Sequence, residues 1–120
     1  FWNRDPETKA KQLDQAEAAY REVERRNRWE TESKSGLSRI YNLRGQPEQA
    51  VQVLQDVLEI MPHQRDFMNQ LGLQLRQMGR LKEALDAFKR ARAYGPHSLT
   101  DANIAALTRK LERQQQPAAP

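Results

Sequence analysis

The residues of this chain that could carry chemistry are few and stand apart from one another. The two histidines, His63 and His97, each follow a proline, and 34 residues separate them. A metal site needs three or four converging ligands, and the sequence places no such cluster near either histidine. We therefore expect both to be surface loop residues, whose equivalent positions make them candidate pH-sensitive groups on one edge of the fold.

No other arrangement of residues predicts catalysis. The chain has no cysteine, which excludes disulfides, thiolate metal ligands and cysteine nucleophiles. The serines at positions 33–38 lie near a helix start, where capping is their expected role, and the pair Glu22 and Glu24 is flanked by arginines on a predicted solvated face. No glycine-rich loop suited to phosphate is present. We predict a protein that is not an enzyme and that uses no metal or other cofactor.

Composition and hydrophobic spacing predict helices along the whole chain. Ala, Leu, Gln, Glu and Arg dominate, and apolar residues recur at intervals of three and four. Asp5 before Pro6 is typical of a helix start. Gly45 and Gly79 are expected to end helices in the left-handed conformation. The expected helices cover about 6–27, 33–44, 47–61, 64–78, 81–94 and 99–113.

An internal repeat is the strongest signal in the sequence. Residues 31–62 and 65–96 come into phase when one segment is shifted by 34 residues. Small residues stand where two helices would approach closely, larger apolar residues would fill the gap to the next repeat, and a proline closes each repeat. The aligned pairs are Leu37 with Leu71, Gly45 with Gly79, Ala50 with Ala84, Leu54 with Phe88, Val57 with Ala91, and Pro62 with Pro96.

These residues and spacings resemble the tetratricopeptide repeat (TPR) family. The second segment is the closer match, because Gly72 also stands at a signature position, where the first segment has Ser38. Both segments lack the family's early tryptophan and have Lys34 and Met68 instead. The resemblance implies an all-α fold, an α-solenoid of antiparallel helix pairs with about six helices.

The resemblance also divides the chain. We expect a disordered N-terminal edge, the second helix of a partial repeat, two TPR units, a capping helix and a disordered tail. Helix 6–27 lacks its own hairpin partner, and repeat arrays bury their core between neighbours, so we expect its apolar flank to pack against a second copy or to exchange with one. Whether another chain supplies the missing first helix stays open. The segments are 1–5, 6–28, 29–62, 63–96, 97–113 and 114–120.

The function that the resemblance implies is that of a protein-interaction scaffold. Such a scaffold would hold a peptide or partner protein in a concave groove lined by the first helix of each repeat, and it would take no small-molecule substrate. Arginines among amides can hold carboxylates or backbone carbonyls, although the same residues also fit a plain solvated surface. The groove candidates are Arg39, Asn42, Leu43, Asn69, Gln70, Leu73, Arg76 and Asn103, with Lys110 as a further candidate.

Two other functions stay open. Residues 63–96 carry seven basic and three acidic side chains, a net +4, so the helix within 80–92 is a candidate nucleic-acid surface, although that face lacks the aromatic residues that stack on bases. Phe1 and Trp2 resemble an interfacial aromatic pair, which would suit an accessory domain of a membrane-tethered assembly or of an enzyme. In that case only a parent segment outside this chain would meet the membrane. The compartment stays open between cytoplasm and periplasm.

Overall fold

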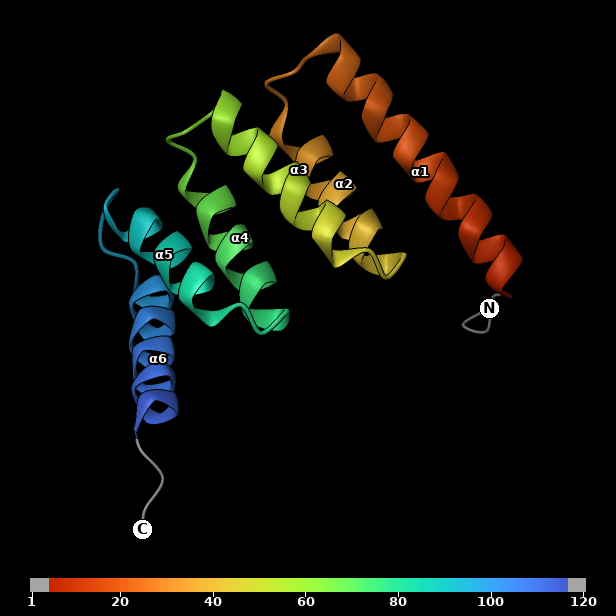
Figure 1. Ribbon diagram of the computed structural model, residues 1–120. Helices are drawn as coiled ribbons and strands as arrows, with labels where there is room; N and C mark the ends of the chain where they lie inside the picture. The colour runs from red at the N-terminus through yellow and green to blue at the C-terminus, as the bar shows by residue number, and fades with distance from the viewer. Residues whose placement is uncertain (1–4, 117–120) are drawn as a thin grey trace. The chain divides into compact units, whose positions relative to one another are not determined.

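The computed structural model describes residues 5–116, and within that range all regular secondary structure is helical (Figure 1). The bounds agree with the predicted helices to within two residues, which confirms the all-α prediction. The helices are α1 (Pro6–Arg26), α2 (Thr31–Leu43), α3 (Pro47–Ile60), α4 (Arg65–Gln77), α5 (Leu81–Arg92) and α6 (Ser98–Gln115). The aromatic pair Phe1 and Trp2 lies outside the described residues.

Two glycines end helices as predicted. Gly45 and Gly79 have φ angles of 72° and 77°, a left-handed conformation that residues other than glycine adopt at a cost. Each follows a helix and precedes the next one by a few residues, so the chain reverses direction in a short turn. The two turns have the same conformation at equivalent positions, so the repeat in the sequence is also a repeat in the structure.

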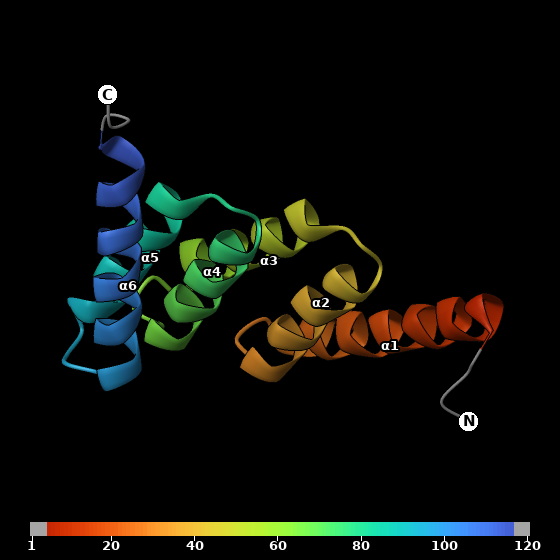
Figure 2. The same cartoon turned by 90° about the horizontal axis from the view of Figure 1, so that it is seen from below.

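The chain forms two compact units, an N-terminal unit of residues 1–57 and a C-terminal unit of residues 58–120. In the N-terminal unit, α1 lies antiparallel against α2 (Figure 2). The ring of Tyr20 on α1 covers Gly36 on α2 so closely that even a Cβ atom at this glycine would collide with the ring. No residue of α1 is buried, whereas α2 buries six of its own.

In the C-terminal unit, α5 contacts both α4 and α6. The α4–α5 pair buries the predicted core residues Leu71, Leu75, Ala84 and Phe88. Phe88 lies over Gly72, and a Cβ atom at Gly72 would come within 2.8 Å of its ring. Because Gly72 has no side chain, the two helices can approach closely. The repeat alignment predicts this role for its small residues.

The ends of the described chain differ from the sequence-based segments. Asp5 caps α1 as its position before Pro6 predicts, since its carboxylate accepts a hydrogen bond from the Thr8 backbone N–H at 2.7 Å, although the segment division places it in the disordered edge. At the other end, α6 continues to Gln115, so two residues of the expected tail are helical. Glutamine and arginine favour helix, and the first proline comes only at position 117. The expected disorder of residues 1–4 and 117–120 falls outside the described residues.

Candidate functional site

The predicted groove residues of the C-terminal unit meet where α4 and α6 come together. Arg76 on α4 donates from Nη1 to Oδ1 of Asn103 on α6 at 2.7 Å. Earlier along α4, Asn69 accepts at Oδ1 from the Thr100 hydroxyl at 2.9 Å. Thr100 is itself buried, so this bond ties α6 to α4. The structure therefore brings Asn69, Arg76 and Asn103 together.

An apolar side chain stands between these polar contacts. Leu73 follows Asn69 by four residues and precedes Arg76 by three, a spacing that puts all three on one helix face. Its side chain is 41% exposed, which is unusual for a leucine in a helix that otherwise buries its apolar residues. Gln70 shares the face and is half-buried. We name this set, Asn69, Gln70, Leu73, Arg76 and Asn103, the α4–α6 surface.

The N-terminal unit carries a smaller surface of the same chemistry. Arg39, Asn42 and Leu43 lie three and four residues apart on α2, and all three are exposed. Leu43 is 51% exposed. Arg39 makes no ion pair within residues 5–116. We name these three residues the α2 surface. Lys110, the further candidate, is exposed on α6.

The two histidines have different partners, although they are equivalent in sequence. His63 Nδ1 lies 2.9 Å from the Tyr94 hydroxyl, and the two rings meet edge to face. His97 caps α6, where its Nδ1 accepts from the Thr100 backbone N–H at 3.3 Å. Among the described residues no three His, Cys, Asp or Glu side chains gather as a metal site would require.

Acidic side chains neutralise part of the basic segment around α5. Arg80 pairs with Glu83 at 2.6 Å, and the bond from Arg80 lowers the pKa of that carboxyl. Arg92 pairs with Asp101 on α6. Lys82, Lys89 and Arg90 are exposed. The basic segment thus divides into paired arginines at its ends and exposed cations between them.

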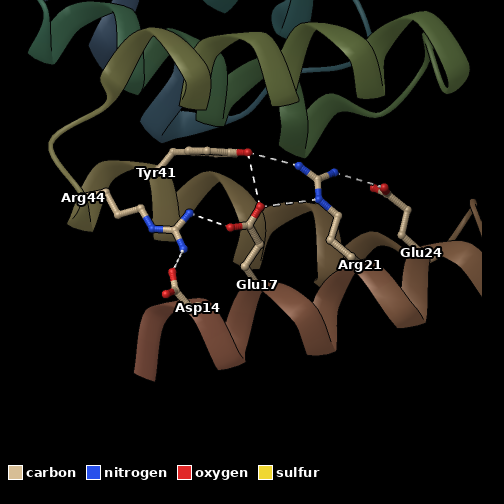
Figure 3. A network of polar contacts seen from close by, with 6 residues as sticks. All are labelled: Asp14, Glu17, Arg21, Glu24, Tyr41 and Arg44. Carbon is tan, nitrogen blue, oxygen red and sulfur yellow. Dashed lines mark hydrogen bonds and ion pairs between the residues drawn. The ribbon is translucent and has the colours of Figure 1, made fainter. Parts of the chain in front are cut away.

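One set of residues, not predicted from the sequence, joins α1 to α2 (Figure 3). Arg44 after α2 pairs with Asp14 at 2.7 Å and with Glu17 at 2.6 Å on α1. The hydrogen bond from Arg44 holds the pKa of the Glu17 carboxyl below its ordinary value. Arg21 donates to the Tyr41 hydroxyl at 3.1 Å.

A buried lysine ends this row of contacts. Lys34 is 2% exposed, and its Nζ lies 3.4 Å from Glu24 on α1. Glu24 also accepts from Arg21 at 3.3 Å. A sequence signal was present, because positions 14, 17, 21 and 24 follow the three- and four-residue spacing of one helix face. The prediction that Glu24 belongs to a solvated face was incomplete, since this side chain contacts the neighbouring helix.

A sequence profile described as tetratricopeptide repeat matches residues 7–71, which is more than half of the chain. This chain belongs to the tetratricopeptide repeat family. The match begins in α1, so the leading helix is part of the TPR pattern, and it ends within α4. Among curated protein sequences, none matches this chain.

Solved TPR structures share the fold. The Sgt2 TPR domain of Aspergillus fumigatus aligns with a TM-score of 0.72 at 20% identity, over 94% of this chain and 79% of that one. A thermophilic TPR protein of Thermus thermophilus aligns with a TM-score of 0.74 at 24% identity, over 89% of this chain and 55% of that one.

A third structure contains a bound peptide. The type III secretion chaperone SycD of Yersinia enterocolitica, in complex with a peptide of the translocator YopD, aligns with a TM-score of 0.70 at 14% identity, over 86% of this chain and 85% of that one. At these identities the likeness establishes the fold. It is the fold of a protein-interaction scaffold. No helix within residues 5–116 combines the length and apolar character needed to cross a membrane.

Proposed function

We propose that this TPR chain binds a peptide segment of a partner protein on its α4–α6 surface. The observation that carries the proposal is the exposed Leu73 beside Arg76, whose guanidinium is oriented by Asn103 at 2.7 Å. Arginine is one of the residue types from which interfaces draw most of their affinity, and an exposed leucine beside it gains when binding removes its apolar surface from water. The preferred peptide would therefore carry an apolar residue close to a carboxylate.

The hydrogen bonds of the α4–α6 surface favour this use. Arginine carries five N–H donors, and Arg76 uses one of them on Asn103, so others are available for a carboxylate or a backbone carbonyl of the ligand. Because Asn103 and Asn69 are fixed by contacts between α4 and α6, the surface is ordered before the ligand arrives. Pre-ordering reduces the entropy that binding would otherwise lose.

The α2 surface offers the same combination, with Leu43 exposed near Arg39. We include it in the proposal as a second contact surface for a partner protein. The SycD complex supports a peptide as the kind of ligand, because that chaperone of similar fold is in complex with one. The partner of this chain is defined by the chemistry above and not by that likeness.

The test uses peptides selected on the protein itself. A random peptide phage library is panned against the wild-type chain, and the selected peptides are synthesised. Their affinities are measured by fluorescence anisotropy for the wild type and for the variants Leu73→Asp, Arg76→Glu and Arg39→Glu. We expect Leu73→Asp and Arg76→Glu each to weaken binding by about tenfold or more, with a smaller loss for Arg39→Glu.

A matched control changes the same charge elsewhere. Arg90→Glu alters an exposed arginine of the same unit that lies outside the α4–α6 surface, and it should leave peptide affinity within about twofold. Circular dichroism checks that every variant keeps its helical content. Peptides that bind Leu73→Asp as tightly as the wild type would contradict the proposal.

A further inference from the structure

The faces that α1 and α2 present to each other are complementary in charge along their length. The ion pairs between the helices all join an acidic side chain of α1 to a basic side chain of α2 or to Arg44 directly after it, and the ring of Tyr20 lies over Gly36 between them. Arg21 of α1 adds a hydrogen bond to the Tyr41 hydroxyl of α2. Because the helices are antiparallel, the early residues of α1 meet the end of α2. Along α1 the order is Asp14, Glu17, Tyr20 and Glu24, and their partners are Arg44, Arg44, Gly36 and Lys34 respectively.

This complementarity makes the interface selective without making it strong. No residue of α1 is fully buried, so its release would expose only the covered parts of half-buried side chains such as Tyr20. Ion pairs that stay partly in solvent contribute little each, because water already satisfies the separated charges. Any competing helix would need acidic residues and an aromatic ring in the same order. A second copy of this chain carries such a helix.

The connection between α1 and α2 suits an exchange between copies. It consists of residues 27–30, and Trp29 within it is 55% exposed with the Arg28 guanidinium 5.3 Å from its ring. In a reciprocal exchange the connection opens, and the two connections lie next to each other where the chains cross. The exposed indole of each copy would then be covered by the other chain.

We propose that α1 is exchanged between two copies of this chain, so that the α1 of each copy docks on the α2 of the other. The acidic face of α1 and the basic face of α2 form the same contacts in this dimer as within one chain. The dimer has one new contact, between the two connections at Trp29. This dimerisation is separate from peptide binding, because it leaves the α4–α6 surface unchanged.

The experiment reverses one charge in each of two chains. Glu17→Arg places a cation opposite Arg44, and Arg44→Glu places an anion opposite Glu17 and Asp14. Neither variant alone can form the Glu17–Arg44 pair, in a monomer or in a homodimer. In an exchanged heterodimer both pairs form. The α1 of the Glu17→Arg chain places its new arginine opposite the new glutamate of the Arg44→Glu chain, and the other α1 forms the wild-type pair of Glu17 with Arg44. The two variants are mixed at high concentration and analysed by native mass spectrometry, which separates heterodimers from homodimers by mass.

We expect wild-type dimers that increase with concentration in light scattering. In the mixture we expect heterodimers to exceed the two homodimers by roughly tenfold, the ratio that two recovered ion pairs of about 0.7 kcal/mol each supply. A wild type that stays monomeric at all concentrations would overturn the proposal. A mixture in which heterodimers show no excess would also overturn it, because dimers that do not exchange α1 gain nothing from the mixing.

Two controls separate exchange from failed folding and from general charge effects. The chain that carries both Glu17→Arg and Arg44→Glu recovers a pair on its own and should dimerise like the wild type. Mixing Glu7→Arg with Arg39→Glu reverses the same kinds of charge at positions that do not contact each other, and this mixture should give no heterodimer excess. Trp29→Ala should reduce the wild-type dimer while helical content stays constant; an unchanged dimer would show that the connections do not meet.

Discussion

The α1–α2 pair and the α4–α5 pair use the same local device within different chemical surroundings. In each pair an aromatic ring covers a glycine on the facing helix, Tyr20 on Gly36 and Phe88 on Gly72. Around Phe88, which is fully buried, the neighbours are apolar core residues. Around Tyr20 the neighbours form ion pairs, and no residue of its helix is buried.

Close helix approach and hydrophobic burial are therefore separable in this fold. A glycine opposite a ring sets the distance between two helices, whereas the residues around the ring decide how strongly the helices hold. Hydrophobic burial gives the α4–α5 pair an interaction that salt does not screen. The ion pairs of α1–α2 give specificity of partner and register, with less stability.

The largest effect is expected from removing the rings. Phe88→Ala leaves a cavity in the α4–α5 core and should lower the free energy of unfolding by about 3–5 kcal/mol. Tyr20→Ala should lower it by about 1 kcal/mol, because the ring is only half-buried. Urea unfolding followed by circular dichroism measures both values. Equal losses would remove the distinction between the two pairs.

A smaller difference is expected when a methyl group is added to each glycine. Gly72→Ala should destabilise the protein by about 1–3 kcal/mol, because the ring of Phe88 has no room to move. Gly36→Ala should change stability by less than about 1 kcal/mol, since Tyr20 can turn toward solvent and alanine favours helix. Thermal unfolding of the two variants makes this comparison, and a larger loss for Gly36→Ala would contradict it.

Acid should loosen the α1–α2 pair before the α4–α5 pair. The pKa of Glu17 in the folded protein lies below its ordinary value of 4.5 because Arg44 donates to the carboxylate. A lowered folded-state pKa means that the stabilisation is present above about pH 4.5 and is lost as the pH falls through the lowered pKa. NMR can follow this change, because the Gly36 α-protons lie against the Tyr20 ring and the Gly72 α-protons lie against the Phe88 ring.

On titration from about pH 6 to about pH 3, we expect the Gly36 resonances to move toward random-coil positions while those of Gly72 stay in place. Arg44→Ala removes the bond that lowers the pKa and should shift the Gly36 transition to higher pH. A Gly36 transition that is the same with and without Arg44 would show that another group controls the docking of α1.

The smallest effect is expected on the basic segment. Replacing Lys82, Lys89 and Arg90 by alanine should change stability by less than about 0.5 kcal/mol, because these exposed side chains make no ion pair within residues 5–116. Single-stranded DNA titrated in increasing salt tests the nucleic-acid alternative with the same variant. A steep loss of affinity with salt that disappears in the triple variant would favour that alternative.

The fold could be predicted from the sequence, because the apolar spacing, the turn glycines and the closing prolines are local signals. Gly45 and Gly79 were assigned correctly for that reason. The α1–α2 contacts could not be predicted from the sequence, because charged residues occur both in solvent and against a facing helix. The sequence alone does not show which helix lies opposite. Lys34 is the clearest case. Its position in the repeat predicts burial, whereas its charge predicts exposure, and only the structure shows Glu24 beside it.

The candidate surface was predictable in part. The repeat phase placed Asn69, Leu73 and Arg76 on one face of a helix, and the structure adds their cross-helix partners Thr100 and Asn103. The different partners of His63 and His97 could not be predicted, because Tyr94 comes close to His63 only after the chain has folded.

The turns at Gly45 and Gly79 have one more consequence. Apart from the glycine and its two chain neighbours, no heavy atom lies within 4 Å of the place where a side chain would begin at Gly45 or Gly79, and both φ angles are positive. The constraint at these turns is therefore one of handedness and not of size. A mirror-image residue such as D-alanine favours positive φ and would fit there without displacing any atom. At these two turns, glycine is therefore required because L-amino acids disfavour positive φ, and not because space is short.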